Sequence, residues 1–209
     1  MAWLTRRDGS VLVGHGPFED LARPPASGAA FHLGDFSLKS PKRWKVPHRI
    51  EVLDAQDFAD RFSGEAPLRC QWQPLDAAPF SVVFQEIMSS IHSGVFEKTV
   101  PVVTECGVAD REPGAAIMAA VARQVSPLRS FGWVEGASGF AGATPELLFS
   151  LDGTRLETMA LAGTARSDDR EVFAVDDKEI REHEYVAQTL VSKLLDLGKL
   201  ERCPREILD

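Results

Sequence analysis

The sequence predicts an α+β fold in which antiparallel sheets pack with helices. Asp8-Gly9 and Asp152-Gly153 each separate two apolar runs, and Asp-Gly is a favoured dipeptide in tight hairpin turns because glycine tolerates positive φ. Helical patterns alternate with these hairpins and not with single strands, which favours an antiparallel sheet over a doubly wound parallel one. The chain has 209 residues, 44% of them hydrophobic, enough for one sizeable domain or two small ones.

The first 75 residues are predicted from turn signals and composition. We expect a hairpin over residues 2–14, a strand over 30–36, a loop over the basic segment 37–49, a short helix over 54–62 and a linker over 64–79. We expect residues 1–75 to form a variable N-terminal segment. We expect this segment to pack on the same fold as residues 76–209.

The second part has the clearest helical pattern. Its apolar residues recur at i, i+3, i+4, i+7, i+8 and i+11 and form one stripe: Phe80, Val83, Phe84, Ile87, Met88 and Ile91. Asp76 is the expected N-cap of this helix and Gly94 its stop. Further along we expect a strand over 98–104, a helix over 113–123, a strand over 129–135, a hairpin whose first strand begins at Glu146, and a helix from Asp176 to Gly198.

Charge and composition exclude several classes of protein. The formal net charge is −8 with no basic block, which argues against a nucleic-acid partner and against an anionic membrane surface. The three cysteines are scattered without metal-ligand spacing and are expected to be reduced thiols. The longest apolar run, residues 115–122, is too short to cross a bilayer, and the N-terminus lacks a signal-peptide core. We therefore expect a soluble cytoplasmic protein.

Two single residues could carry chemistry. Lys98 follows a helix and its glycine stop, and a partly desolvated lysine can act as a general base; alternatively, Lys98 is a solvated residue at a strand start. Glu146 lies at the mouth of an apolar run, where a carboxyl is held more protonated and can act as a general acid. The alternative is an outward-facing or arginine-paired carboxylate.

The segment 176–186 contains a group of polar residues with helical spacing. Glu179, Glu182 and His183 lie at i, i+3 and i+4 and share one side of a helix. Carboxylates placed in this way suit Mg²⁺, which takes only one or two protein carboxylates and keeps several waters. The alternatives are a solvated acidic helix start, favoured by the helix dipole, and a core histidine.

Four motifs, in order, resemble those of the chorismate-utilising enzymes, which include isochorismate, salicylate, anthranilate and aminodeoxychorismate synthases. The motifs are FEKTVPVV (96–103), GATPELLFS (142–150), LAGTAR (161–166) and KEIREHEYV (178–186). The resemblance covers roughly residues 75–198, and the second and third motifs are its most specific part.

The resemblance implies a role for each matching residue. Lys98 is similar to the general base that activates water in isochorismate and salicylate synthases, and Glu146 to the general acid that protonates the departing C4 hydroxyl. Gly163 and Thr164 match a substrate-contacting pair, and Glu182 matches a Mg²⁺ ligand. Anthranilate synthases carry another residue at the position of Lys98. Ala162 stands where aminodeoxychorismate synthases often carry a nucleophilic lysine.

The resemblance predicts an isochorismate synthase, with a salicylate synthase as the alternative. Such an enzyme would serve menaquinone, siderophore or salicylate biosynthesis. It also implies a C-terminal half with further Mg²⁺ ligands and with arginine and tyrosine groups for the carboxylates of chorismate. We accordingly expect this chain to be an N-terminal portion that is inactive alone, exposes apolar edges and pairs with that half or forms a homodimer. The third alternative is a truncated, non-catalytic binding module.

Overall fold

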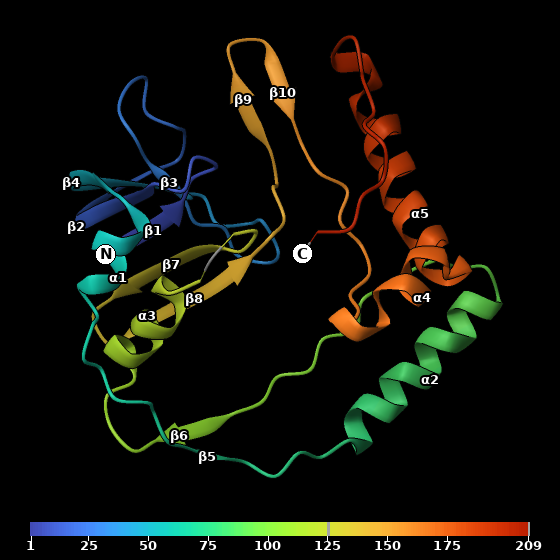
Figure 1. Cartoon of the computed structure of the whole chain (residues 1–209), viewed down its shortest axis with the longest axis horizontal. Coiled ribbons are helices and arrows are strands. Elements are labelled where there is room, and N and C mark those ends of the chain that lie inside the picture. Colours follow the sequence, from blue (N-terminus) through green and yellow to red (C-terminus); the bar gives the residue numbers. More distant parts are fainter. Residues whose placement is uncertain (125, 209) are drawn as a thin grey trace. The chain divides into compact units, whose positions relative to one another are not determined.

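The computed structural model describes residues 1–124 and 126–208 (Figure 1). The chain divides into two compact units, of which the first comprises Met1–Asp60 and Val121–Asp209 and the second Arg61–Ala120. Helices and strands are both present, and all strand pairs among the described residues are antiparallel. The predicted α+β class is confirmed. The predicted division at residue 75 stays a prediction.

A six-stranded antiparallel sheet forms the frame of the first unit, with the order β3-β4-β2-β1-β7-β8. Its strands are β1 (Ala2–Thr5), β2 (Val11–Leu21), β3 (Phe31–His32), β4 (Trp44–Leu53), β7 (Arg129–Glu135) and β8 (Ser138–Thr144). The N-terminal hairpin and the later hairpin β7–β8 join because β1 pairs with both β2 and β7. The predicted hairpin at Asp8-Gly9 and the predicted strand over 129–135 are both confirmed.

One face of this sheet carries the core. Trp3 lies opposite Val13 on β2 and Gly132 on β7, and both Trp3 and Val13 are fully buried. Phe58 of helix α1 (Ala55–Asp60) covers this face, with its ring centroid 6.0 Å from that of Trp3. Residue 132 must be glycine, because a Cβ there would lie 2.0 Å from the Trp3 ring.

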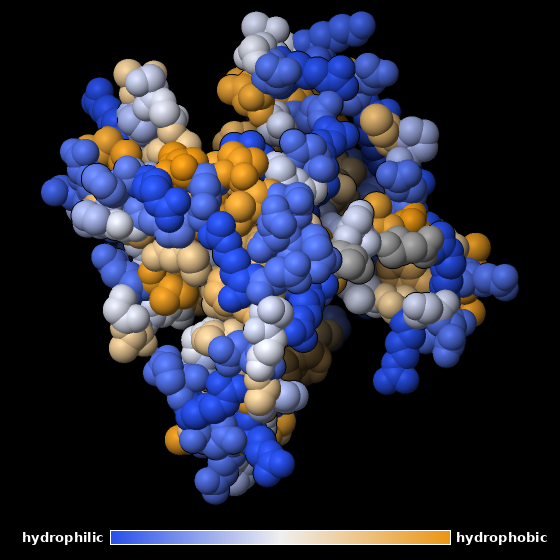
Figure 2. Space-filling view, turned by 60° about the vertical axis from the view of Figure 1, so that its left-hand side comes forward, coloured by the Kyte–Doolittle hydropathy of each residue, from blue (hydrophilic) through white to orange (hydrophobic). Residues whose placement is uncertain are grey.

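The opposite face of the sheet is apolar and partly open to solvent. Leu4, Leu12 and Val52 are cross-strand partners, and such partners project on the same face. Leu4 is 48% exposed and Val52 51% exposed. Figure 2 shows hydrophobic side chains reaching the surface among hydrophilic ones.

A long strand replaces part of the predicted basic loop. Residues 44–49 belong to β4, which pairs with β2 from Val11↔Leu53 to Leu21↔Trp44. Lys45 reaches across this ladder to Asp20, with 2.7 Å between Nζ and Oδ1. The prediction of a loop over 37–49 was therefore wrong for its second half. Pairing with β2 stabilises this segment as a strand in spite of its polar composition. A local sequence pattern cannot show such pairing, because the partner strand is distant in sequence.

The remaining elements of the first unit follow β8 in sequence. They are β9 (Ser150–Asp152), β10 (Arg155–Glu157), η1 (Ser167–Asp169), α4 (Arg170–Val175), α5 (Asp177–Leu194) and η2 (Leu195–Leu197). The predicted turn at Asp152-Gly153 joins β9 to β10, and Gly153 has the positive φ of +57° that such a turn requires. The final helix begins where predicted, and its helical extension ends just before Gly198.

The second unit contains most of the remaining regular structure. It holds β5 (Cys70–Trp72), α2 (Ala78–His92) and β6 (Gly107–Ala109), and α3 (Gly114–Ala122) begins in it. Helices α2 and α3 confirm two sequence predictions, and Gly94 follows α2 with a φ of +73°. Asp76 bonds the amide of Ala78, although the N-cap position itself is Ala77. Among the described helices, none combines the length and apolarity needed to cross a membrane.

Two predictions for segments around this unit were wrong. Residues 98–104 contain no strand; Pro101 cannot donate a ladder hydrogen bond, and Val100 and Val102 are exposed. The predicted linker over 64–79 contains the strand β5, which pairs with β6. Both errors concern strand pairing, because a short strand depends on a partner distant in sequence.

Candidate functional site

The start of helix α5 is fixed by a side-chain cap. Oδ1 of Asp176 accepts hydrogen bonds from the amides of Lys178 and Glu179, at 2.9 and 3.0 Å. These amides lie in the first turn of the helix, where N–H groups have no hydrogen-bond acceptor within the helix. Asp176 and Glu179 have the spacing of a capping box in the sequence, and these two hydrogen bonds form the half of the box that Asp176 contributes. The cap holds the backbone from which Glu179 and Glu182 project.

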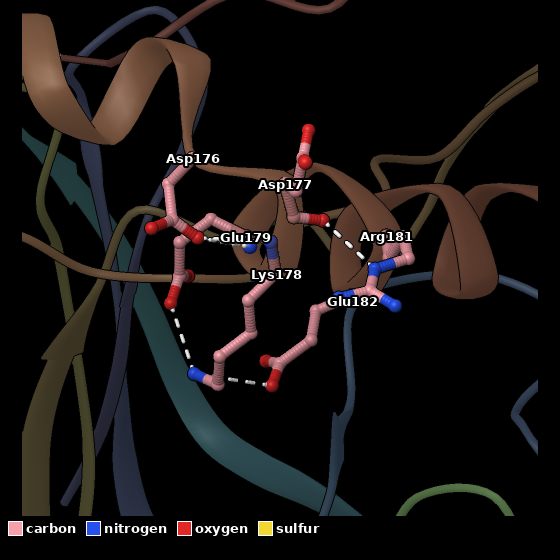
Figure 3. A network of polar contacts seen from close by, with 6 residues as sticks. All are labelled: Asp176, Asp177, Lys178, Glu179, Arg181 and Glu182. Carbon is pink, nitrogen blue, oxygen red and sulfur yellow. Dashed lines mark hydrogen bonds and ion pairs between the residues drawn. The ribbon is translucent and has the colours of Figure 1, made fainter.

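A lysine stands between these two carboxylates. Nζ of Lys178 lies 3.0 Å from Oε1 of Glu179 and 3.4 Å from Oε1 of Glu182 (Figure 3). The pKa of Lys178 is raised above its ordinary value, first by the hydrogen bond to Glu179 and then by that to Glu182. Sequence reasoning missed Lys178, although its i, i+4 spacing to Glu182 is the spacing of a helical ion pair.

The LAGTAR segment lies against the same group. Gly163 has a φ of +82°, and a Cβ built on it would lie 2.5 Å from Oε2 of Glu179 and 2.9 Å from the ring of Phe173 on α4. The positive φ favours glycine here, and any side chain would also require the Glu179 carboxylate and the Phe173 ring to shift. The substrate-contacting motif suggested by the sequence and the acidic start of α5 form one local surface. Thr164, the second residue of that pair, follows Gly163 and is exposed.

Glu146 lies on the segment that leads into the β9–β10 hairpin. It was expected inside a strand, but residues 145–149 have no regular structure, because β8 ends at Thr144 and Pro145 follows without an amide donor. The Glu146 side chain is exposed, and its amide donates to Oγ1 of Thr144 at 3.1 Å. Its apolar surroundings, expected from the sequence, are not present in this structure.

The hairpin connects the Glu146 segment to the LAGTAR segment. Ser150 pairs with Glu157, and one step beyond the ladder Oγ1 of Thr158 donates to the carbonyl of Leu148 at 2.7 Å. Glu157 also pairs with Arg7 from the β1–β2 turn. The pKa of Glu157 is lowered, chiefly by the hydrogen bond to Arg7. The two segments that flank the hairpin are thus joined at its base.

Lys98 belongs to the second unit. It is half-buried in an irregular segment that begins after the α2 stop at Gly94. Its role as a base stays a prediction from the motif FEKTVPVV, as does the acid role of Glu146.

The residues at the α5 start fit a hard cation. Two carboxylates already meet one cationic group, the Lys178 ammonium, and Mg²⁺ takes one or two protein carboxylates with waters completing its shell. Among the described residues there is no group of three or more His, Cys, Asp or Glu side chains that could hold a metal ion. Nδ1 of His183 is buried and has no hydrogen-bond partner in the described part of the chain.

The C-terminal segment is tied to α5 next to this group. Arg202 binds the Glu184 carboxylate with two nitrogens, at 2.8 and 2.5 Å, the fork geometry of a strong charge-assisted pair. Arg205 donates to the carbonyl of Ala174 in α4 at 2.5 Å. The hydrogen bond to Arg202 is the main cause that lowers the pKa of Glu184 from its ordinary 4.5 to about 2.

Comparisons with known proteins identify the family of the chain. A protein-family model described as "Chorismate binding enzyme" matches residues 44–207. The chain therefore belongs to the chorismate-binding enzyme family. The match includes all four motifs and extends through β4 of the six-stranded sheet. A search of curated proteins found no significant match, and a search of solved structures found none either.

The close approach of Gly163 to Glu179 predicts the effect of adding one methyl group. Gly163→Ala places Cβ against the carboxylate and the Phe173 ring, whereas Gly28→Ala has nearly the same φ, +83°, with nothing within 4 Å. We expect Gly28→Ala to lower the free energy of unfolding by roughly 1–2 kcal/mol through backbone strain alone. Gly163→Ala should lower it by roughly 1 kcal/mol more, the low end of the range for overpacking, because the Glu179 carboxylate and the Phe173 ring must also shift. Urea unfolding measures both, and equal losses would contradict the contact.

The Glu184–Arg202 pair predicts a pH dependence. The pKa of Glu184 is lower in the folded chain than its ordinary 4.5. The pair therefore stabilises the fold fully above pH 4.5, and this contribution is lost as the pH falls toward 2. The carboxyl ¹³C shift of Glu184 should stay nearly constant between pH 5 and pH 3. In Arg202→Gln it should titrate within this range, whereas Arg205→Gln should behave like the unchanged protein. A normal titration of Glu184 in the unchanged protein would refute the pairing.

Proposed function

We propose that the protein catalyses the isomerisation of chorismate to isochorismate, with this chain supplying the base, the acid, the substrate turn and one metal ligand. The observation that carries the proposal is the contact between Gly163 and Glu179. It joins the motif that resembles a substrate-binding turn to the carboxylates that resemble a Mg²⁺ site. Family membership makes chorismate the natural substrate class for this surface.

The reaction adds one water and loses one water. Lys98 takes a proton from the attacking water, whose oxygen bonds to C2 of the ring. The ring double bonds shift, and the C4 hydroxyl leaves with the proton donated by Glu146. A base and an acid in these roles each contribute a factor of roughly 10²–10⁴ to the rate. Gly163 and Thr164 hold the substrate while both proton transfers occur.

Glu182, with Glu179 beside it, would hold the divalent cation. When bound, Mg²⁺ neutralises and orients the ring carboxylate of chorismate. Chorismate is a dicarboxylate, and the protein that binds it has a formal net charge of −8. The remaining steps depend on side chains of the chain itself. Backbone amides of the LAGTAR turn orient the ring, and Glu146 lies on the segment joined to that turn through the hairpin base.

Lys98 and Ala162 favour the isochorismate and salicylate synthases over the other branches of the family. Lys98 resembles the base of isochorismate and salicylate synthases and differs from the residue in anthranilate synthases. Ala162 lacks the nucleophilic amine of many aminodeoxychorismate synthases. Salicylate synthases use the same base and acid and then eliminate pyruvate, so the product distinguishes the two activities.

The test is product analysis with chorismate and Mg²⁺, using protein expressed from the gene's complete reading frame. We expect isochorismate as the product. Lys98→Ala and Glu146→Gln should each lower kcat by at least roughly 100-fold. Glu171→Gln, on the exposed side of α4, is the matched charge control and should retain activity.

Two results would contradict parts of this assignment. Salicylate and pyruvate in place of isochorismate would move the protein to the salicylate branch. Full activity of Lys98→Ala would remove the lysine from the role of base.

A further inference from the structure

Lys178 occupies the position between the two carboxylates that a metal ion would need. Its ammonium contacts Oε1 of Glu179 at 3.0 Å and Oε1 of Glu182 at 3.4 Å. In Figure 3 the lysine side chain curves back so that Nζ lies between both acidic side chains. A cation and this ammonium cannot use the same two oxygen atoms together.

The Glu179 carboxylate is held in place, whereas the Lys178 side chain is largely solvated. Asp176 fixes the amides of Lys178 and Glu179, and Oε2 of Glu179 faces the Gly163 backbone across a space too small for a methyl group. The Glu179 side chain is only 18% exposed, whereas that of Lys178 is 68% exposed. Lysine carries its charge on a flexible four-carbon stem. Lys178 is therefore the most solvated of the three side chains, since those of Glu179 and Glu182 are 18% and 34% exposed.

The electrostatics favour exchange of one cation for another. Two carboxylates on adjacent turns repel each other unless a positive charge lies between them. Lys178 supplies a single charge at a largely solvated position, where an ion pair is weak. A hard divalent ion supplies two charges to the same oxygens and prefers them as ligands.

We propose that Lys178 is a tethered competitor of the divalent cation. It holds Glu179 and Glu182 in place in the metal-free protein and swings into solvent when the metal binds. The proposal rests on the proposed function, because it takes Glu182 as a Mg²⁺ ligand. Its consequence is that the chain itself weakens Mg²⁺ binding, so that occupancy responds to the Mg²⁺ concentration.

Calorimetric titration with MgCl₂ tests this directly and without turnover. Lys178→Gln should bind Mg²⁺ roughly 2- to 10-fold more tightly than the unchanged protein, the gain expected from removing two exposed ion pairs. Lys178→Arg keeps the charge and should not show this gain. Lys193→Gln removes the same charge from the last turn of α5 and should change the affinity by less than about 2-fold, since exposed charges at that separation are screened.

A second readout follows the lysine itself. In protein with ¹³C-labelled lysine, the Cε resonance of Lys178 should shift on addition of Mg²⁺, and that of Lys193 should not. Equal affinity in Lys178→Gln and the unchanged protein, with binding lost in Glu182→Gln, would overturn the competitor role and leave the metal site intact. Binding that is absent throughout, or unaffected by Glu182→Gln, would overturn the metal assignment and this proposal with it.

Discussion

The arrangement of the candidate site depends on the absence of a side chain at residue 163. Because Gly163 has no Cβ and adopts positive φ, the LAGTAR segment can turn directly against the Glu179 carboxylate and the Phe173 ring. A larger residue would push this segment away from the start of α5. The LAGTAR segment and the acidic helix start would then be separate features. With glycine they form one surface, which two separate sequence motifs build together.

The surrounding structure holds the two sides of this contact. On one side, Asp176 caps α5 and fixes the direction of its first turn. On the other, the β9–β10 hairpin carries the chain from the Glu146 segment to the LAGTAR segment, and Arg7 ties the hairpin to the N-terminal strands through Glu157. The six-stranded sheet thus supports the hairpin through a residue far from it in sequence. The Lys178 ammonium completes the group by balancing two carboxylates that would otherwise repel.

The sequence predicts those parts of the fold that depend on local patterns. The Asp-Gly turns, the helix stop at Gly94 and the cap at Asp176 all follow from neighbouring residues, and the structure confirms them. Strand β4 was missed because its stability comes from pairing with β2, and the strand over 98–104 was predicted from composition without such a partner.

The candidate site shows the same division. The motifs and the carboxylates could be found from spacing, and family membership is confirmed. The exposure of Glu146 and the contact of Gly163 with Glu179 could not be predicted from the sequence, because they depend on how distant segments pack. Lys178 was within reach of a spacing rule, but its position between two carboxylates is visible only in three dimensions.

If the LAGTAR segment and the carboxylates of α5 form one site, the binding of Mg²⁺ and the binding of chorismate must be coupled. The measurement is the Mg²⁺ affinity of the protein, by calorimetry, with and without chorismate under conditions that prevent turnover. We expect chorismate to tighten Mg²⁺ binding, and Mg²⁺ to tighten chorismate binding by the same factor, as thermodynamic linkage requires. A Mg²⁺ affinity unchanged by saturating chorismate would contradict a shared site.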